Sequence, residues 1–259
     1  MIAPFIIDPA YNMKLTSIKE SKIAGMLCLA AFASLTFVIS LVFFPSHLTS
    51  VVTKAIGALM QNLTYSAGHQ GFLISLAILV GLSAWLRRHT TNNLHLLIQL
   101  GLLLVLSFGA KTFLKEFTQS PRPYTETLTE LHVIDSPQSF YNLTVDEKND
   151  RIHQVDEQVS EWRTKHWIGE TDYSFPSGHT IFVSVCVLFF GGLFASQGRY
   201  ALASLVIVWG VGVAASRLWL GMHRPVDLFA SMLFGLILYI IIPSHYPILD
   251  KVLFKIKNR

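Results

Sequence analysis

Residues 23–44 read IAGMLCLAAFASLTFVISLVFF, a run of 22 residues without a charged side chain. A helix that crosses a bilayer needs roughly 17–25 apolar residues, so this run is long enough to span a membrane. It is longer than the roughly 7–15-residue core of a signal peptide, and no small-residue cleavage pattern follows it. The stretch therefore predicts a retained membrane anchor.

Five more uncharged stretches follow, at residues 55–86, 94–110, 181–196, 200–216 and 228–249. A buried helix of a soluble protein can explain one such run but not six. We therefore predict an all-α, polytopic integral membrane protein with a single domain over residues 1–259. The six expected transmembrane helices are residues 23–44, 67–86, 94–114, 179–197, 200–216 and 228–249, with an extracytoplasmic loop at 116–172.

The composition agrees with this class. Apolar residues make up 52% of the chain and charged residues 14%, whereas a soluble domain carries about 25% charged residues. This excludes a disordered chain and disfavours an ordinary soluble enzyme. The net charge of +4 is too small to indicate a nucleic-acid partner. Cys28 and Cys186 lie inside apolar runs, which is typical of small buried residues rather than of a disulfide or metal pair.

Basic residues predict the orientation, because they collect on the cytoplasmic side of membrane proteins. With six spans, the basic clusters that flank the helices all fall on one side, which we predict to be cytoplasmic together with both termini. These residues are Lys14, Lys19, Lys22, Arg87, Arg88, Arg199, Lys251, Lys255, Lys257 and Arg259.

The long loop has the opposite charge. Residues 116–172 contain 12 acidic and 5 basic residues, a local net charge of −7. Apolar residues recur at helical spacing between Val145 and Trp162, and Thr144 with Glu147 forms a capping-box pattern at the start. We interpret this segment as a solvated acidic helix over the outer face, in preference to a direct role with substrate. Trp162 and Trp167 are expected at the membrane interface.

Three short motifs lie at the outer ends of the spans. The first is Lys115 to Pro123 (KEFTQSPRP), the second is Pro176 to His179 (PSGH), and the third is Ser216 to Asp227 (SRLWLGMHRPVD). Their residues suit a tetrahedral anion, because arginine binds phosphate oxygens through two N–H groups. The N-terminus of a helix that begins near Ser177 and Gly178 also favours a phosphate.

The histidines of these motifs supply the groups for catalysis. A neutral imidazole is a nucleophile and a protonated one is an acid near neutral pH. Pro225 suits the first turn of a helix, and the i, i+4 spacing then brings Asp227 close to His223. The carboxylate would accept the imidazole N–H and orient the opposite nitrogen.

The three motifs resemble the signature of the type 2 phosphatidic acid phosphatase superfamily: Lys-x6-Arg-Pro, Pro-Ser-Gly-His and Ser-Arg-x5-His-x3-Asp. All positions are present in order and at the family spacing. Within the superfamily, the span count and the segment from His166 to Pro176 are most similar to bacterial phosphatidylglycerophosphate phosphatases. The resemblance covers most of the chain and is weakest in residues 1–90.

This resemblance implies a role for each matching residue. His223 would attack phosphorus and form a phosphohistidine, Asp227 would orient His223, and His179 would act as general acid and then base. Five residues would hold the phosphate oxygens: Lys115, Arg122, Ser177, Gly178 and Arg217. The family uses no metal or other cofactor, and no acidic pair beside the motifs suggests a divalent-ion site.

The resemblance further implies lipid phosphates as substrates and a bacterial inner-membrane protein with its site on the periplasmic face. Phosphatidylglycerophosphate comes first, followed by phosphatidic acid, lysophosphatidic acid, diacylglycerol pyrophosphate and undecaprenyl pyrophosphate. Two alternatives stay open. Vanadate-dependent haloperoxidases share the motifs but look like soluble helical proteins, and a lipid transporter or scaffold would place charges along its spans.

Taken singly, most motif residues also have a structural interpretation. Lys115 and Arg122 could be interfacial side chains, Ser177 a helix N-cap and Asp227 a favourable first-turn acid. Their joint placement favours a site. Lys111 lies outside the motifs and is interpreted as structural, and Arg224 occupies a free position of the third motif.

Overall fold

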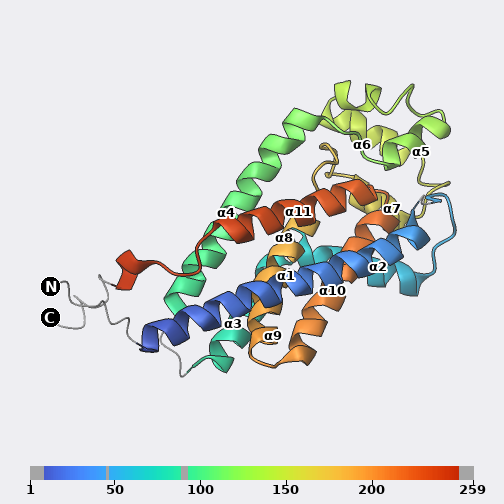
Figure 1. The fold of residues 1–259 in the computed structure, drawn as a ribbon. Coiled ribbons are helices and arrows are strands. Elements are labelled where there is room, and N and C mark those ends of the chain that lie inside the picture. Colours follow the sequence, from blue (N-terminus) through green and yellow to red (C-terminus); the bar gives the residue numbers. More distant parts are fainter. Residues whose placement is uncertain (1–8, 45–46, 89–92, 251–259) are drawn as a thin grey trace.

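The computed structural model describes residues 9–44, 47–88 and 93–250, and within these ranges every regular element is a helix (Figure 1). Lys251, Lys255, Lys257 and Arg259, together with the side chains of Lys14 and Lys19, lie outside the described residues. The elements are α1 (Pro9–Phe43), α2 (Lys54–Ala67), α3 (Phe72–Leu86), α4 (Asn93–Thr118), α5 (Tyr124–Glu130), the 3₁₀ turn η1 (Ser139–Asn142), α6 (Val145–His153), α7 (Glu161–Trp167), α8 (Gly178–Cys186), the π-helical turn η2 (Val187–Gly191), α9 (Gly192–Ser196), α10 (Tyr200–Trp219) and α11 (Pro225–Ile241).

In the part of the chain that the structure describes, four helical segments are long and apolar enough to cross a membrane: Glu20–Phe43, Leu94–Thr118, Gly178–Ser196 and Tyr200–Trp219. A fifth results if α2 and α3, which are bent by 69° at the break between them, count as one span. The structure thus supports four or five spans of the six expected. The span expected at 228–249 stays a prediction, and so does the one expected at 67–86 if α2 and α3 do not form a single span.

The two uncertain spans differ from expectation for identifiable reasons. The helix expected from residue 67 begins only at Phe72, because the chain turns through Gly68 and Gly71 before α3 starts. Helix α11 ends at Ile241 instead of reaching residue 249, since Pro243 lacks an N–H and disfavours a helical residue before it. Its 17 residues rise about 25 Å, slightly less than the ~30 Å hydrocarbon thickness.

The continuous segment α8–η2–α9 forms the centre of the bundle, and 83% of its apolar, membrane-spanning stretch is buried. It packs against α1, α10 and α11 (Figure 1). Glycines allow α1 to approach very closely: a Cβ at Gly25 would lie 2.3 Å from the carbonyl oxygen of Leu188, and one at Gly192 would lie 2.6 Å from that of Ser21. Such contacts between small residues are a main source of helix association in membranes.

The loop between α4 and α8 folds into a small helical cap with its own core at one end of the bundle (Figure 1). The capping box of Thr144 and Glu147 is confirmed. The single helix expected from Val145 to Trp162 is wrong: α6 ends at His153, and α7 begins only at Glu161.

The apolar residues between the two helices explain this break. Val155 and Val159 are buried in the core of the cap through a non-helical stretch, and Val145 is exposed. Trp167 is fully buried rather than interfacial, because its indole N–H donates to the carbonyl of Leu220 at 2.7 Å. The cap is therefore packed directly onto the loop after α10.

Candidate active site

A cavity of about 410 Å³ lies where the cap meets the end of the bundle. Five of the predicted site residues line it: Lys115, Arg122, Gly178, His179 and His223. The other three, Ser177, Arg217 and Asp227, are buried. Arg217 and Asp227 contact the lining through Glu170 and His223, and Ser177 directly precedes Gly178 in the chain. The tertiary structure thus brings the three motifs together.

A carboxylate and a hydroxyl lie next to Nδ1 of His223. Its Nδ1 lies 3.5 Å from Oδ2 of Asp227, which is long for a hydrogen bond, and 3.3 Å from Oγ of Ser174. The Ser174 hydroxyl donates to Asp227, which also accepts the backbone N–H of Arg224 at 2.9 Å. Because Nδ1 faces this group, Nε2 is the nitrogen available for chemistry. Ser174 carries no motif signal and was missed by the sequence analysis.

The second and third motifs are connected through Ser231 on α11. Its hydroxyl oxygen accepts the backbone N–H of Ser177 at 3.0 Å and donates to the carbonyl of Asp227 at 2.6 Å. Ser177 is the N-cap of α8, since its Oγ accepts the N–H and the hydroxyl of Thr180. Because α8 starts here, His179 lies in its first turn, within the cavity lining.

Two carboxylates pair with the cations of the first and third motifs. Oε2 of Glu170 lies 2.6 Å from Nη2 of Arg217 and 3.7 Å from Nη2 of Arg122. Asp172 pairs with Arg122 and lies 2.7 Å from Nζ of Lys115. Neither acid belongs to the three motifs, although both lie within the segment 166–176 that resembles the family.

Both acids are ionised at neutral pH. Burial would raise the pKa of Asp172, but the positive charges of Arg122 and Lys115 lower it to about 2. Burial likewise opposes ionisation of Glu170, and the charge of Arg217 outweighs it, so that this pKa falls well below its usual range. The cations are therefore held in place, and partly neutralised, before any substrate binds.

Two basic residues outside the predicted site set have different surroundings. Lys111, which was interpreted as structural, lines the cavity beside Gly178, where a Cβ would lie 2.9 Å from its Cδ, so its position also allows contact with a ligand. Its i, i+4 relation to Lys115 on α4 is a signal that could have found it. Arg224 instead points away, pairing with Glu126 at 2.6 Å and donating to the carbonyl of Pro121.

The cavity also has apolar walls. Phe72 at the start of α3 and Phe108 on α4 line it, with their ring centroids 6.0 Å apart. The break between α2 and α3 brings Gly68 next to the second motif, since a Cβ there would lie 2.8 Å from Nε2 of His179. A ligand in this cavity would meet charged and aromatic surfaces together.

Within the described residues, the fold and the site define a helical membrane protein that holds two histidines among buried cations at one end of its bundle. Residues 96–248 match the family described as the PAP2 superfamily, and the chain belongs to this superfamily.

Among curated proteins, the chain is similar to phosphatidylglycerophosphatase B of Escherichia coli K12, with 32% identity over 165 residues that cover 62% of this chain and 65% of that protein. It is also 32% identical over 175 residues to phosphatidylglycerophosphatase B of Haemophilus influenzae, covering 62% of this chain and 70% of that protein. The match thus spans slightly less than two thirds of the first relative.

Proposed function

We propose that this protein is a metal-independent membrane phosphatase that hydrolyses lipid phosphate esters through a phosphohistidine. The observation that carries the proposal is the cavity in which His179 and His223 lie among cations, with Phe72 and Phe108 on its walls. A lipid phosphate presents these two chemistries together, a charged headgroup next to hydrocarbon. The relatives named phosphatidylglycerophosphatase B support phosphatidylglycerophosphate as the first substrate to test.

The charges around the cavity suit a phosphate monoester. Lys111, Lys115, Arg122 and Arg217 contribute four positive charges, and Glu170 with Asp172 removes two. A net charge of +2 remains once the carboxylate of Asp227 is counted against the protonated His179 that the proposed first step requires. A phosphate monoester carries nearly two negative charges at neutral pH, so it can be neutralised without an added metal ion.

In the proposed first step, Nε2 of His223 attacks phosphorus as the bond to the lipid oxygen breaks. His179 donates a proton to the leaving oxygen, and Asp227 stabilises the positive charge on His223. In the second step, His179 takes a proton from water, whose oxygen attacks phosphorus as the bond to Nε2 breaks. Inorganic phosphate leaves and both imidazoles return to their starting state.

Phosphate release by the full chain in detergent, with EDTA present, tests the proposal. The substrates would be phosphatidylglycerophosphate, phosphatidic acid, lysophosphatidic acid, diacylglycerol pyrophosphate and undecaprenyl pyrophosphate, with His223→Ala as the blank. Release by the wild type alone supports the proposal, and the relative rates rank the lipids. Folded protein that releases no phosphate from any of them would overturn it.

Halide oxidation with vanadate and peroxide would favour the haloperoxidase alternative, and lipid binding without turnover would favour a scaffold.

The expected topology has six spans, both termini in the cytoplasm and the cavity on the periplasmic face of a bacterial inner membrane. Cys28 and Cys186 are buried and free, so an introduced cysteine should dominate maleimide labelling. Glu157→Cys on the exposed cap should react with an impermeant maleimide in spheroplasts, where the outer membrane no longer blocks access. Gln197→Cys, in the exposed turn before α10, should react only after the inner membrane is permeabilised. The reverse pattern would contradict this orientation.

Lys111→Ala should raise KM about 10-fold and leave kcat within about 3-fold. Its ammonium is expected to contact the phosphate in the bound state and the transition state alike, and a charge-assisted hydrogen bond contributes about 1.5–3 kcal/mol. Steady-state kinetics on one lipid at fixed detergent checks this. Lys148→Ala on the cap is the matched control, because that lysine lies over the rings of Phe140 and Tyr141 instead of in the cavity lining. An unchanged KM for Lys111→Ala would remove this residue from the site.

A further inference from the structure

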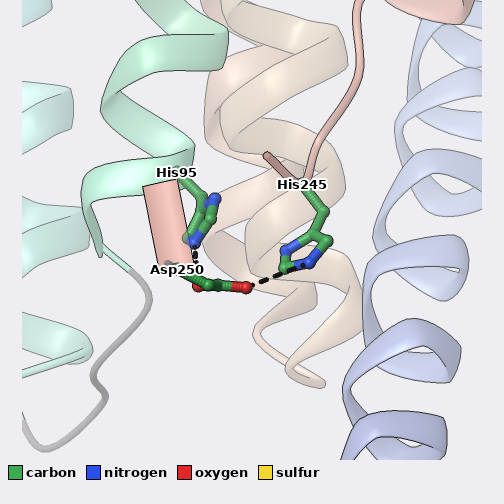
Figure 2. A group of neighbouring side chains, drawn as sticks. All are labelled: His95, His245 and Asp250. Carbon is green, nitrogen blue, oxygen red and sulfur yellow. Dashed lines mark hydrogen bonds and ion pairs between the residues drawn. The ribbon is translucent and has the colours of Figure 1, made fainter. Parts of the chain in front are cut away.

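A second cluster of chemically active side chains lies at the other end of the bundle. His95 in the first turn of α4 and the pair His245 and Asp250, which follow α11, meet there (Figure 2). Nε2 of His95 lies 2.9 Å from Oδ1 of Asp250, and Nε2 of His245 lies 3.2 Å from Oδ2. One ligand atom from each residue lies within 4.8 Å of the others.

We propose that these three residues bind a Zn²⁺ ion that fastens the segment after α11 to the start of α4. Zinc binds imidazole nitrogen and carboxylate oxygen at about 2.0–2.2 Å, which places neighbouring ligands of a tetrahedral site roughly 3.3 Å apart. The two short distances are close to that value, although they end on different oxygens of Asp250. Because single ligand atoms of the three residues spread over as much as 4.8 Å, the side chains must close by about 1.5 Å to hold one ion. The combination of two imidazoles and a carboxylate also favours zinc over the harder Mg²⁺ and Ca²⁺ ions.

The cluster is already largely assembled. His95 is 4% exposed, and its ring stacks on that of His245 with centroids 4.8 Å apart. A hydrogen bond of 3.0 Å from Gln99 to Ser244 makes a second connection between α4 and the same segment. Because the elements are held together independently of an ion, little chain entropy is lost when zinc binds.

One hydrogen bond must rearrange on binding. The backbone N–H of Tyr246 donates to Nδ1 of His95 at 3.1 Å, so the proton of the neutral ring lies on Nε2, where it can bond to Asp250. Zinc on Nε2 moves that proton to Nδ1, and the peptide of Tyr246 turns away. The metal-free state is therefore a histidine–aspartate hydrogen-bonded pair, and zinc competes with it.

The fourth ligand can come from an adjacent cavity of about 120 Å³, which His95 and His245 both line. This volume is ample for a water molecule. Lys22 and Arg87 line the same cavity, and Lys22 donates to the carbonyls of Ile240 and Ile242. These positive charges weaken the binding of a bare cation, but they favour hydroxide or another small anion as the fourth ligand.

The proposed zinc site is structural and lies far from the cavity that His179 and His223 line. His95 and Lys115 are separated by 20 residues of one helix, which rise about 30 Å. A zinc ion at His95 therefore cannot contact a substrate near Lys115. The proposed zinc site is independent of the proposed phosphatase activity and compatible with metal-independent catalysis.

The test uses the full chain without a histidine tag, purified in detergent and then treated with a chelator. Elemental analysis after zinc is restored should give about one zinc per chain, and the melting temperature should rise with zinc concentration. Asp250→Asn retains an oxygen that accepts a hydrogen bond, and it should weaken zinc binding about 100-fold or more, as should His245→Gln. Replacing zinc with Co²⁺ should produce the visible absorption of a tetrahedral nitrogen–oxygen site.

His153→Gln is the matched control. His153 is an exposed histidine that also pairs with an aspartate, Asp156 at 3.0 Å, and the described residues supply no third ligand there. Its replacement should leave zinc content and the zinc-dependent melting shift unchanged. Wild-type protein that retains no zinc, and whose melting temperature ignores it, would overturn the proposal in favour of a hydrogen-bonded latch. The zinc site is equally refuted if Asp250→Asn binds zinc as tightly as the wild type.

Discussion

Replacing His223 with alanine should lower kcat by at least about 10⁴-fold, the largest effect expected of any substitution in this chain. The proposed reaction forms its covalent bond at Nε2 of this residue, and alanine leaves no nucleophile in that position. The imidazole is almost fully buried, so loss of its packing is a concern for folding. His223→Gln fills most of the volume and should be equally inactive while it unfolds at nearly the wild-type temperature.

Covalent labelling separates the two histidines. A short incubation with ³²P-labelled lipid phosphate, quenched in alkali because phosphohistidine is acid-labile, should label the wild type and never His223→Ala. His179→Ala should lower kcat about 10²–10⁴-fold, the usual contribution of general acid–base catalysis, and it should still accumulate some phosphoenzyme when the leaving group is activated. The assignment would be reversed if His223→Ala still became labelled and the label disappeared when His179→Ala was added to it.

Asp227→Asn should reduce kcat about 10³–10⁴-fold with little change in KM. The carboxylate accepts hydrogen bonds from Ser174 and from the backbone N–H of Arg224, and it faces Nδ1 of His223. An amide in its place can present an N–H to Nδ1, which selects the wrong tautomer and leaves Nε2 protonated. It also removes the negative charge that stabilises the imidazolium.

Ser174→Ala provides the graded comparison for this prediction. Ser174 contacts both partners, but it carries no charge, and the direct approach of Asp227 to His223 survives its removal. We expect a loss of about 10-fold in kcat, consistent with one neutral hydrogen bond. If Ser174→Ala is as inactive as Asp227→Asn, the serine transmits the whole effect. A wild-type rate for Asp227→Asn would show that the carboxylate does not orient the nucleophile.

Much of the helical framework could be predicted from sequence, because a run of uncharged residues has few options besides a spanning helix. The runs at Glu20–Phe43, Leu94–Thr118, Gly178–Ser196 and Tyr200–Trp219 are of this kind. The errors fall where hydropathy is a poor guide. Gly68 and Pro243 interrupt apolar stretches through backbone conformation, and the cap follows its own core instead of one helical period.

The candidate site shows a similar division. The motif residues can be recognised in the sequence by their type and spacing, and the structure places all eight in or beside one cavity. Their assigned roles stay predictions. Ser174, Glu170 and Asp172 lie within the segment 166–176, which resembles the family as a whole, but no motif spacing selects them from the other polar residues there. Only their position against the motif residues makes them part of the site.

The sequence by itself determined the class of protein and the reactive groups, because hydrophobicity and short motifs are local properties of the chain. Tertiary structure decided which charges meet. It pairs Arg217 with Glu170 across 47 positions, and it brings His95 to Asp250 across 155. The physical reason is that an ion pair or a metal site depends on distances of a few ångströms between side chains. Those distances are set by how helices pack, and helix packing leaves no periodic signal along the chain.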